Sequence, residues 1–277
     1  MLADVQRDKI AFLSTPEAYG LSGVPVERID THISIVWLAG DRAYKLKRAV
    51  RFDYVDFSSI ELRRAACDAE VRLNRRTAPS LYLGVLPVTR ETDGSLALRG
   101  EGVPLDWLVE MVRFDQATLF DRLAERDGLD IALMDALADE IVRLHGGAEP
   151  RRDHGGRDGM AWVIDGNALG FADDPVLEPA ACRRLTADAR AVLDRCTHLL
   201  EARRRDGSVR CCHGDLHLRN ICLVDGIPTL FDAVEFNENI SCVDVLYDLA
   251  FLLMDLWRRG LRSHANVVFN GYLARTV

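Results

Sequence analysis

The strongest constraint on this chain is a run of polar side chains at residues 212–221, which reads Cys-His-Gly-Asp-Leu-His-Leu-Arg-Asn-Ile. A second acidic residue, Asp232, follows in the triplet Leu-Phe-Asp. Asp215 can accept the proton of an attacking hydroxyl, whereas Asn220 and Asp232 can converge on a magnesium ion that bridges phosphate oxygens. An aspartate, an asparagine five positions later and a further aspartate beyond it are typical of a phosphoryl-transfer site.

The segments around this run predict how its side chains are presented. Short apolar stretches predict strands at residues 209–212, 221–224 and 228–231. Asp225–Gly226 predicts a tight hairpin turn between the last two. His213 belongs to the same catalytic loop, where we expect it to brace the loop through a hydrogen bond to the backbone or to Asp232. An alternative interpretation is a zinc site formed by Cys212, His213, His217 and Cys222, although their spacing is irregular and lacks a Cys-x-x-Cys pair.

Composition limits the kind of protein that this chain can be. Its 277 residues are 48% hydrophobic, which predicts a folded globular protein with one large domain or two smaller lobes. The formal net charge of −8 argues against a nucleic acid partner bound through a broad basic surface. The longest apolar segment, residues 243–257, is interrupted by three aspartates, so it predicts a buried helix and no association with a membrane.

The compartment is indicated by the cysteines and by the amino terminus. Seven cysteines without a regular framework favour a reducing environment. The first residues lack the basic and apolar pattern of a signal peptide. We therefore expect a cytoplasmic protein.

The chain predicts an α+β fold in two lobes, residues 1–113 and 114–277. The first lobe is expected to hold a small antiparallel sheet with strands at residues 26–29, 33–38, 43–47, 81–88 and 105–114. Its one main helix is predicted over residues 58–76, capped by Ser58. The second lobe is expected to be mainly helical, with a mobile loop at residues 151–159 and helices at residues 131–145, 180–205 and 243–259.

The first lobe offers a lysine and a carboxylate for a nucleotide. An apolar stripe on the predicted helix would consist of Leu62, Ala66, Ala69 and Leu73. Glu70 then falls at the edge of this stripe and can point toward the sheet. Lys45 is our first candidate for its partner, and Lys47 is the alternative because it lies on the same face of the strand.

Four further residues have predicted roles. Thr31 and Ser34 lie in the turn between the first two strands, where their hydroxyl groups and neighbouring backbone N–H groups can bind phosphate oxygens, although the turn has no glycine. Glu235 can face a substrate or solvent. Asp248 either interacts with the dipole of the helix it begins or ties the catalytic loop to that helix.

Together these motifs resemble the aminoglycoside phosphotransferase group of the protein-kinase-like fold. The resemblance is carried by residues 213–220, by Phe231–Asp232 and by the pair Asp244 and Asp248. Short sequence motifs within residues 31–83 are similar to those of a less characterised bacterial branch of this group. In that branch a P-loop ATPase domain often follows the kinase-like domain. The chain stops soon after Tyr272, so that partner domain would be missing from it.

The resemblance implies a bilobal enzyme that binds ATP and magnesium and transfers the γ-phosphoryl group to a hydroxyl of a small molecule. It implies that Asp215 is the catalytic base and that Asn220 and Asp232 are the magnesium ligands. It also implies that Lys45 binds phosphate and that Glu70 holds this lysine. A hinge would lie near residues 110–113, with Met111 beside the nucleotide.

Departures from the protein kinases leave two alternatives open. Gly214 stands where many protein kinases have arginine, and no Ala-Pro-Glu motif follows Asp232, so control by activation-loop phosphorylation is not expected. One alternative is a nucleotide-binding regulatory module with little catalysis, similar to a pseudokinase. The other is a protein kinase that acts on a polypeptide.

Overall fold

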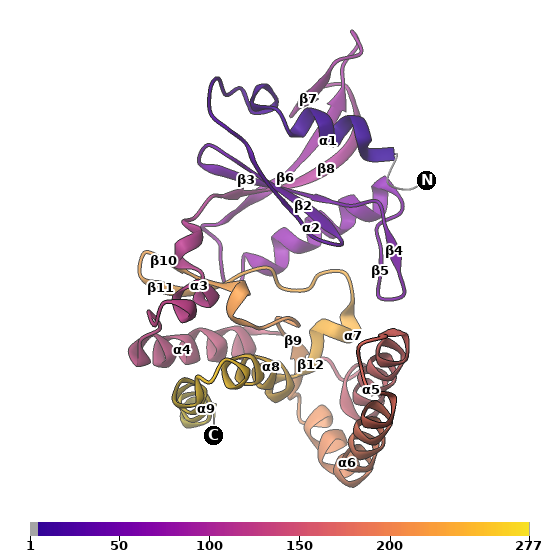
Figure 1. Ribbon diagram of the computed structural model, residues 1–277, viewed down its shortest axis with the longest axis vertical. Coiled ribbons are helices and arrows are strands. Elements are labelled where there is room, and N and C mark those ends of the chain that lie inside the picture. The colour runs from indigo at the N-terminus through magenta and orange to yellow at the C-terminus, as the bar shows by residue number, and fades with distance from the viewer. Residues whose placement is uncertain (1–4, 277) are drawn as a thin grey trace. The chain divides into compact units, whose positions relative to one another are not determined.

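The chain folds into two compact units in a computed structural model that describes residues 5–276 (Figure 1). The first unit comprises residues 5–140 and 218–237, and the second comprises residues 141–217 and 238–276. The predicted α+β class is confirmed, with an antiparallel sheet in the first unit and mainly helices in the second. The division into lobes at residue 113 stays a prediction.

A six-stranded antiparallel sheet forms the centre of the first unit. In spatial order its strands are β1 (Glu27–Asp30), β2 (Ser34–Ala39), β3 (Arg42–Lys47), β8 (Val103–Val112), β6 (Tyr82–Arg90) and β7 (Leu96–Leu98). The predicted strands are all present, whereas β7 was not predicted. Because β8 pairs with both β3 and β6, it fixes the register of the middle of the sheet.

Residues of β3 alternate between the two faces of this sheet, as a pleated strand requires. Tyr44 and Leu46 point to one face, where they join a buried apolar cluster with α1 (Arg7–Leu13). Lys45 and Lys47 point to the other face, toward α2 (Ile60–Asn74). The alternation therefore separates an apolar face from a charged one.

Helix α2 buries a face that only partly matches the sequence prediction. Of the predicted apolar stripe, Ala66 is buried and Ala69 and Leu73 are half-buried, whereas Leu62 is 44% exposed and the prediction is wrong for it. The buried residues of the helix are Arg63, Ala66, Cys67, Glu70, Val71 and Asn74. Half of these are polar, and they can be buried because each has a hydrogen-bonding partner. Glu70 thus lies within the buried face and not at its edge.

The start of α2 also differs by one residue from the prediction. Ser59 is the capping residue, and its Oγ accepts a hydrogen bond from the amide of Leu62 at 3.3 Å. The hydroxyl of Ser58 instead donates to Asp56 Oδ1 at 2.5 Å. Asp56 therefore competes for the side chain that would otherwise cap the helix.

The rest of the first unit consists of short elements. They are the 3₁₀ turns η2 (Pro16–Tyr19), η3 (Gln116–Thr118) and η4 (Leu218–Asn220), the hairpins β4 (Arg51–Phe52) with β5 (Val55–Asp56) and β10 (Ile221–Val224) with β11 (Ile227–Leu230), and the helix α3 (Phe120–Glu125). The predicted turn between β10 and β11 is confirmed, with positive φ at Asp225 and Gly226.

The second unit is mainly helical. Helix α4 (Ile131–Gly147) carries the chain into it, and the remaining elements are α5 (Gly156–Asp173), α6 (Pro179–Arg205), β9 (Val209–Cys211), α7 (Glu238–Ser241), β12 (Cys242–Asp244), α8 (Val245–Arg258) and α9 (Arg262–Thr276). The three helices predicted for this part are present. The mobile loop predicted for residues 151–159 is wrong, because α5 begins inside it at Gly156.

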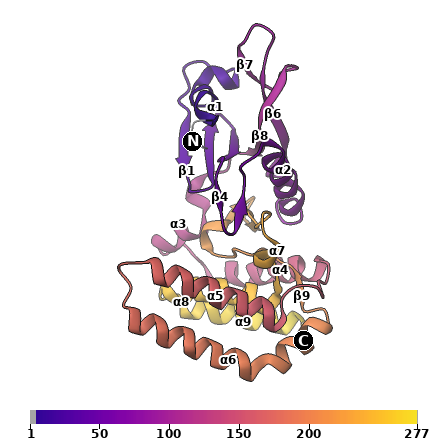
Figure 2. The ribbon, with the colours of Figure 1, turned by 90° about the vertical axis from the view of Figure 1, so that its right-hand side faces the viewer.

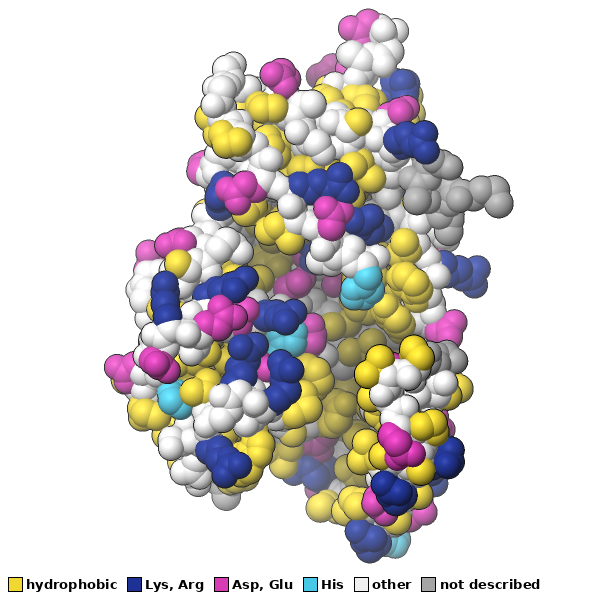
Figure 3. All heavy atoms as spheres, viewed as in Figure 1, with side chains coloured by type: hydrophobic (Ala, Val, Ile, Leu, Met, Phe, Trp, Pro, Cys, Tyr) yellow, Lys and Arg dark blue, Asp and Glu magenta, His cyan; other side chains and the backbone are white. Residues whose placement is uncertain are grey.

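Helices α5 and α6 lie side by side (Figure 2). Apolar side chains remain exposed on both, and Figure 3 shows such side chains in yellow among those of the second unit. The exposed ones include Trp162, Leu169, Leu185 and Leu199. Helix α8 differs, since it buries Leu249, Leu252 and Leu256 as the sequence predicts. Within residues 5–276, no helix has both the length and the apolar character that crossing a membrane requires.

A buried carboxylate ties α2 and the region before α1 to strand β8. Asp106 has no exposed surface and accepts hydrogen bonds from Arg63 Nε at 2.7 Å and from Gln6 Nε2 at 2.8 Å. Lys9 Nζ lies 3.2 Å from the same carboxylate. Both cations are themselves buried, so each depends on Asp106 for its counter-ion.

We therefore predict that Asp106→Ala destabilises the protein by about 3–5 kcal/mol, because it leaves a buried guanidinium without its carboxylate. Urea unfolding followed by circular dichroism measures the change. Asp68→Ala is the matched control on α2, where Asp68 forms an exposed ion pair with Arg64, and it should change stability by less than about 0.5 kcal/mol. Equal stability of the two variants would contradict the prediction.

Candidate functional site

Asn220 and Asp232 meet at the open end of the β10–β11 hairpin. The amide of Phe231 donates a hydrogen bond to the carbonyl oxygen of Asn220 at 3.0 Å, which places Asp232 one residue beyond this pair. Asp232 has a φ of 61°, which is unusual for a residue with a side chain, and its amide donates to the Tyr82 hydroxyl at 3.1 Å. The carboxylate of Asp232 is 41% exposed. The hairpin therefore brings the half-exposed Asp232 and the buried Asn220 to neighbouring positions of the backbone.

Lys45 joins this hairpin to α2. Its Nζ lies 2.9 Å from Glu70 Oε1 and 2.5 Å from Asp232 Oδ1. The predicted contact between Lys45 and Glu70 is thus present. Burial alone would lower the pKa of Lys45, but the two carboxylates raise it well above its ordinary value, so this lysine stays charged.

Lys47 shares the other oxygen of Glu70. Its Nζ bonds to Glu70 Oε2 and to Glu235 Oε1, and its side chain is 1% exposed. Burial lowers its pKa, but Glu235 and Glu70 raise the pKa above the ordinary value. Lys45, with 12% of its side chain exposed, is the more accessible of the two lysines. Glu235 was expected to face a substrate or solvent, and this was wrong because its side chain is 3% exposed and bound to Lys47.

The turn between β1 and β2 is held by its own hydrogen bonds. The Thr31 hydroxyl accepts from the amide of Ser34 at 2.9 Å and lies 3.1 Å from the carbonyl oxygen of Ser34. The hydroxyl of Ser34 is buried and has no hydrogen-bonding partner among the described residues. Thr31 itself is exposed. Contact of either hydroxyl with phosphate stays a prediction.

The expected hinge forms the last part of strand β8. Met111 is paired with Ala43 of β3 on one side and with Tyr82 of β6 on the other. It packs against the apolar cluster that contains Val109 and Cys222.

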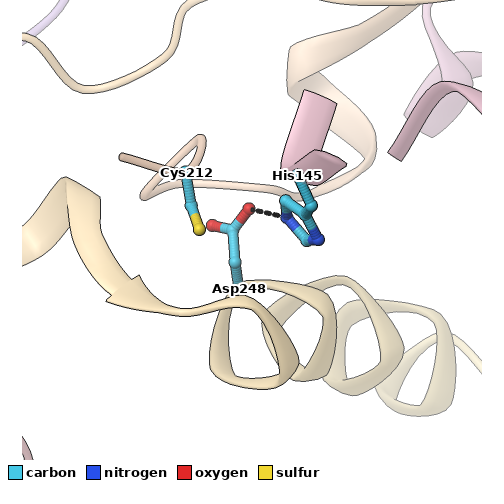
Figure 4. Close-up of side chains that lie close together, drawn as sticks. All are labelled: His145, Cys212 and Asp248. Carbon is cyan, nitrogen blue, oxygen red and sulfur yellow. Dashed lines mark hydrogen bonds and ion pairs between the residues drawn. The ribbon is translucent and has the colours of Figure 1, made fainter. Parts of the chain in front are cut away.

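In the second unit, Asp248 holds the backbone of the catalytic loop. Its Oδ1 accepts from the amide of Gly214 at 2.8 Å, and its Oδ2 accepts from the amide of His213 at 3.2 Å. His145 Nε2 lies 3.0 Å from the same Oδ2 (Figure 4). Asp244 is the residue that caps α8, through the amide of Leu246. Of the two roles considered for Asp248, tying the loop to the helix is therefore confirmed.

The cluster of His145, Cys212 and Asp248 in Figure 4 has its ligand atoms within 4.8 Å of one another, a spacing that could suit a metal ion. Hydrogen bonds account for each group without one. His145 Nδ1 lies 2.9 Å from the Tyr272 hydroxyl, and Cys212 Sγ lies 3.5 Å from the carbonyl oxygen of Val243. We interpret the cluster as a buried brace of the loop.

The two histidines of the considered zinc set interact with Asp215 instead. The ring of His213 accepts a hydrogen bond from the amide of Asp215 at 3.3 Å, which is the backbone contact expected of a bracing residue. His217 Nε2 lies 3.4 Å from Asp215 Oδ2. Burial would lower the pKa of His217, but the hydrogen bond and the charge of Asp215 raise it above the ordinary value.

A family model described as "Phosphotransferase enzyme family" matches residues 40–274. The chain belongs to this family. Its match extends from the β2–β3 turn to α9 and so includes Lys45, Glu70, Asp215 and Asp232.

Curated relatives match nearly the whole of this chain. Uncharacterized proteins of Mycobacterium bovis and Mycobacterium tuberculosis are 30% identical over 270 residues, which is 95% of this chain and 52% of theirs. The chain thus spans about half the length of these relatives.

Solved structures of other proteins share the fold. An aminoglycoside phosphotransferase of Streptomyces rimosus aligns with a TM-score of 0.56 at 17% identity, over 96% of this chain and 92% of that one. A choline/ethanolamine kinase family protein of Mesorhizobium loti aligns with a TM-score of 0.53 at 15% identity, over 99% of this chain and 76% of that one.

Sequence reasoning missed a second set of contacts around this site. Asn74 Oδ1 accepts from the amide of Ala233 at 2.9 Å, and Asn237 Nδ2 donates to the carbonyl oxygen of Tyr54 at 3.0 Å. The available signal was the recurrence of polar residues at 63, 70 and 74 on one face of α2, which a search for apolar residues passes over.

We predict that Asp248→Ala destabilises the protein by about 1–3 kcal/mol for each loop amide that it leaves without an acceptor. Hydrogen bonding keeps the pKa of Asp248 below its ordinary value, against the effect of burial. Its contribution is therefore complete above about pH 4 and is lost as the pH falls through the lower pKa of the folded state. Unfolding by urea at several pH values measures both effects. Asp188→Ala, at an exposed position of α6, should leave the pH profile unchanged.

A second prediction concerns His217. Its imidazole should titrate above the ordinary value of about 6.5, and Asp215→Asn should lower the midpoint because burial then acts without the carboxylate. A pH titration followed by NMR of the ring protons gives both midpoints. An unchanged midpoint in the variant would refute the assignment of the shift to Asp215.

Proposed function

We propose that the chain is an ATP- and Mg²⁺-dependent phosphotransferase that moves the γ-phosphoryl group of ATP to a hydroxyl of a small molecule. Membership of the phosphotransferase enzyme family supports the reaction class. The activity of the longer relatives is part of the same proposal, as are a cytoplasmic location and the P-loop ATPase domain as a partner.

One observation carries the proposal. The ammonium group of Lys45 lies between Glu70 and Asp232, which come from α2 and from the end of the β10–β11 hairpin. A lysine that is held by one buried carboxylate and lies beside a second, half-exposed one can bind the phosphates of a nucleotide while the second carboxylate binds their metal ion.

The side-chain oxygen atoms at the end of the hairpin are of the kind that binds magnesium. Asp232 offers a carboxylate and Asn220 an amide oxygen, and hard divalent cations prefer such oxygen ligands. The carboxylate of Asp232 already lies against a cation, the ammonium group of Lys45. When bound, Mg²⁺ would neutralise charge on the phosphate oxygens. The protein's own part is to hold Asn220 and Asp232 in the register that the hairpin fixes.

Asp215 would accept the proton of the acceptor hydroxyl. Its side chain is 43% exposed, so an acceptor can approach it. The amides of His213 and Gly214 donate to Asp248, and the amide of Asp215 donates to the ring of His213, so the loop backbone is fixed up to and including Asp215. A fixed base within reach of a hydroxyl is what general base catalysis requires.

The remaining nucleotide contacts are assigned to the first unit. Lys45 is preferred to Lys47 as the phosphate-binding lysine, because Lys47 is buried between two carboxylates. Thr31 and Ser34 would approach the phosphates, and Met111 would contact the base. A structure of the Streptomyces rimosus phosphotransferase contains ADP and streptomycin, which makes ADP the natural first probe for this chain.

A second candidate function is nucleotide binding without transfer. It is favoured by the β1–β2 turn, in which the Thr31 hydroxyl is bound to the backbone of Ser34 and no glycine allows close approach of the phosphates. A regulatory module would need only this binding.

We predict that purified protein consumes ATP in a Mg²⁺-dependent reaction with at least one member of a library of small alcohols. Mass spectrometry of the products identifies the phosphorylated acceptor. Asp215→Asn should lower the turnover number by about 10²–10⁴-fold, since that is the usual contribution of a general base. Asp225→Asn is the matched control, because it makes the same chemical change at the exposed turn of the neighbouring hairpin.

The outcome separates the candidates. Turnover that Asp215→Asn leaves unchanged would refute the mechanism. Calorimetry that detects Mg²⁺-dependent binding of ADP, without transfer to any acceptor, would favour the regulatory module. Label that moves from ATP to proteins of a cell extract, and not to small molecules, would favour a protein kinase.

A further inference from the structure

Five alternating charges in the first unit form a closed arrangement, which we call the ion-pair ring. Its members, in order of contact, are Asp232, Lys45, Glu70, Lys47 and Glu235. Asp232 and Glu235 are three residues apart in one segment, so the backbone closes the ring. Glu70 contacts one lysine with each of its oxygens.

The two halves of the ring differ in their exposure to solvent. The side chains of Lys47, Glu70 and Glu235 are at most 3% exposed. Lys45 and Asp232 are 12% and 41% exposed, so they form the half that a ligand can reach. A buried ion pair contributes little net stability compared with apolar side chains of the same size, so stability alone does not explain why Lys47 and Glu235 are charged.

The buried half fixes the segment that begins with Asp232. Lys47 binds Glu235, and its ammonium group lies 5.5 Å from the centre of the Phe57 ring. That ring packs edge-on against Phe236 at 6.1 Å. The left-handed backbone of Asp232 needs such support, because a residue with a side chain adopts this conformation at a cost.

Lys47 also controls how strongly Lys45 is held. With Lys47 present, the carboxylate of Glu70 is divided between two cations. Without it, Glu70 and Glu235 would be two buried carboxylates with Lys45 as the nearest remaining cation of the ring, and Lys45 would be drawn away from an incoming phosphate.

We propose that Lys47 and Glu235 are positioning residues, whose buried ion pair holds the segment 232–237 so that Asp232 can bind the metal ion and Lys45 the phosphate. This inference rests on the proposed function, because it assigns Asp232 and Lys45 those two roles. Neither Lys47 nor Glu235 is expected to touch the nucleotide.

The test compares Lys47→Met/Glu235→Met with the parent chain. Removing both charges together leaves the net charge of the ring unchanged and leaves Glu70 paired with Lys45, so the urea midpoint should stay close to that of the parent. The Mg²⁺ concentration for half-maximal binding of ADP, measured by calorimetry, should rise at least tenfold. Amide hydrogen exchange within residues 232–237 should become at least tenfold faster. Arg122→Met/Glu125→Met, which removes an exposed ion pair of α3, is the control and should change neither quantity.

Each outcome decides the proposal. A folded double variant with the parental Mg²⁺ dependence and exchange rates would overturn it, since the pair would then have only a structural role. If the double variant does not fold, Glu235→Gln replaces it, because the amide keeps the shape of the side chain and one hydrogen bond to Lys47. An unchanged Mg²⁺ dependence in that variant would overturn the proposal equally.

These readouts also separate the inference from the proposed function. Binding of ADP and exchange of amides are measured without an acceptor and without turnover. A parent chain that binds ADP with Mg²⁺ but transfers no phosphate would refute the proposed activity, while the shift in the double variant would still support the positioning role.

Discussion

The first unit depends on one buried carboxylate that is shared by two lysines. Glu70 is fully removed from solvent, and a buried charge of this kind is tolerated only when cations and hydrogen bonds replace its hydration. This requirement sets the rotation of α2 about its axis, because the helix must present Glu70 to β3. It also sets the path of the chain after β11, where Asp232 and Glu235 supply the other partners of the lysines.

In the second unit, too, the hydration of a buried carboxylate is replaced by hydrogen bonds, here mainly from backbone amides. Asp248 is buried and receives the amides of His213 and Gly214, together with the ring of His145. The loop that carries Asp215 is therefore held from a helix that lies later in the sequence. In both units a half-exposed aspartate is carried by a segment that a buried side chain holds, Lys47 through Glu235 in the first unit and Asp248 through two loop amides in the second.

The sequence predicts more of the fold than of the site's surroundings. The strands and the hairpin turn at Asp225–Gly226 follow from local patterns, and the structure confirms them. The contact of Lys45 with Glu70 was also predicted, although the apolar stripe on α2 from which it was argued includes the exposed Leu62 and places Glu70 at its edge. Apolar periodicity could not locate a face that buries Arg63, Glu70 and Asn74, because burial of these residues depends on partners distant in sequence. The pairing of Glu235 with Lys47 could not be predicted for the same reason, since a single glutamate in a sequence does not indicate a buried counter-ion.

The pleat of β3 has a consequence for how this part of the chain can change in evolution. Tyr44 and Leu46 belong to the apolar cluster, while Lys45 and Lys47 belong to the charged face. Deleting or inserting a single residue inside β3 would exchange the two sets, so that ammonium groups would enter the apolar cluster and aromatic groups would meet Glu70. Length variation among homologues should therefore be confined to the turn at Gly40 and to the connection between Lys47 and α2, leaving the interior of β3 constant in length.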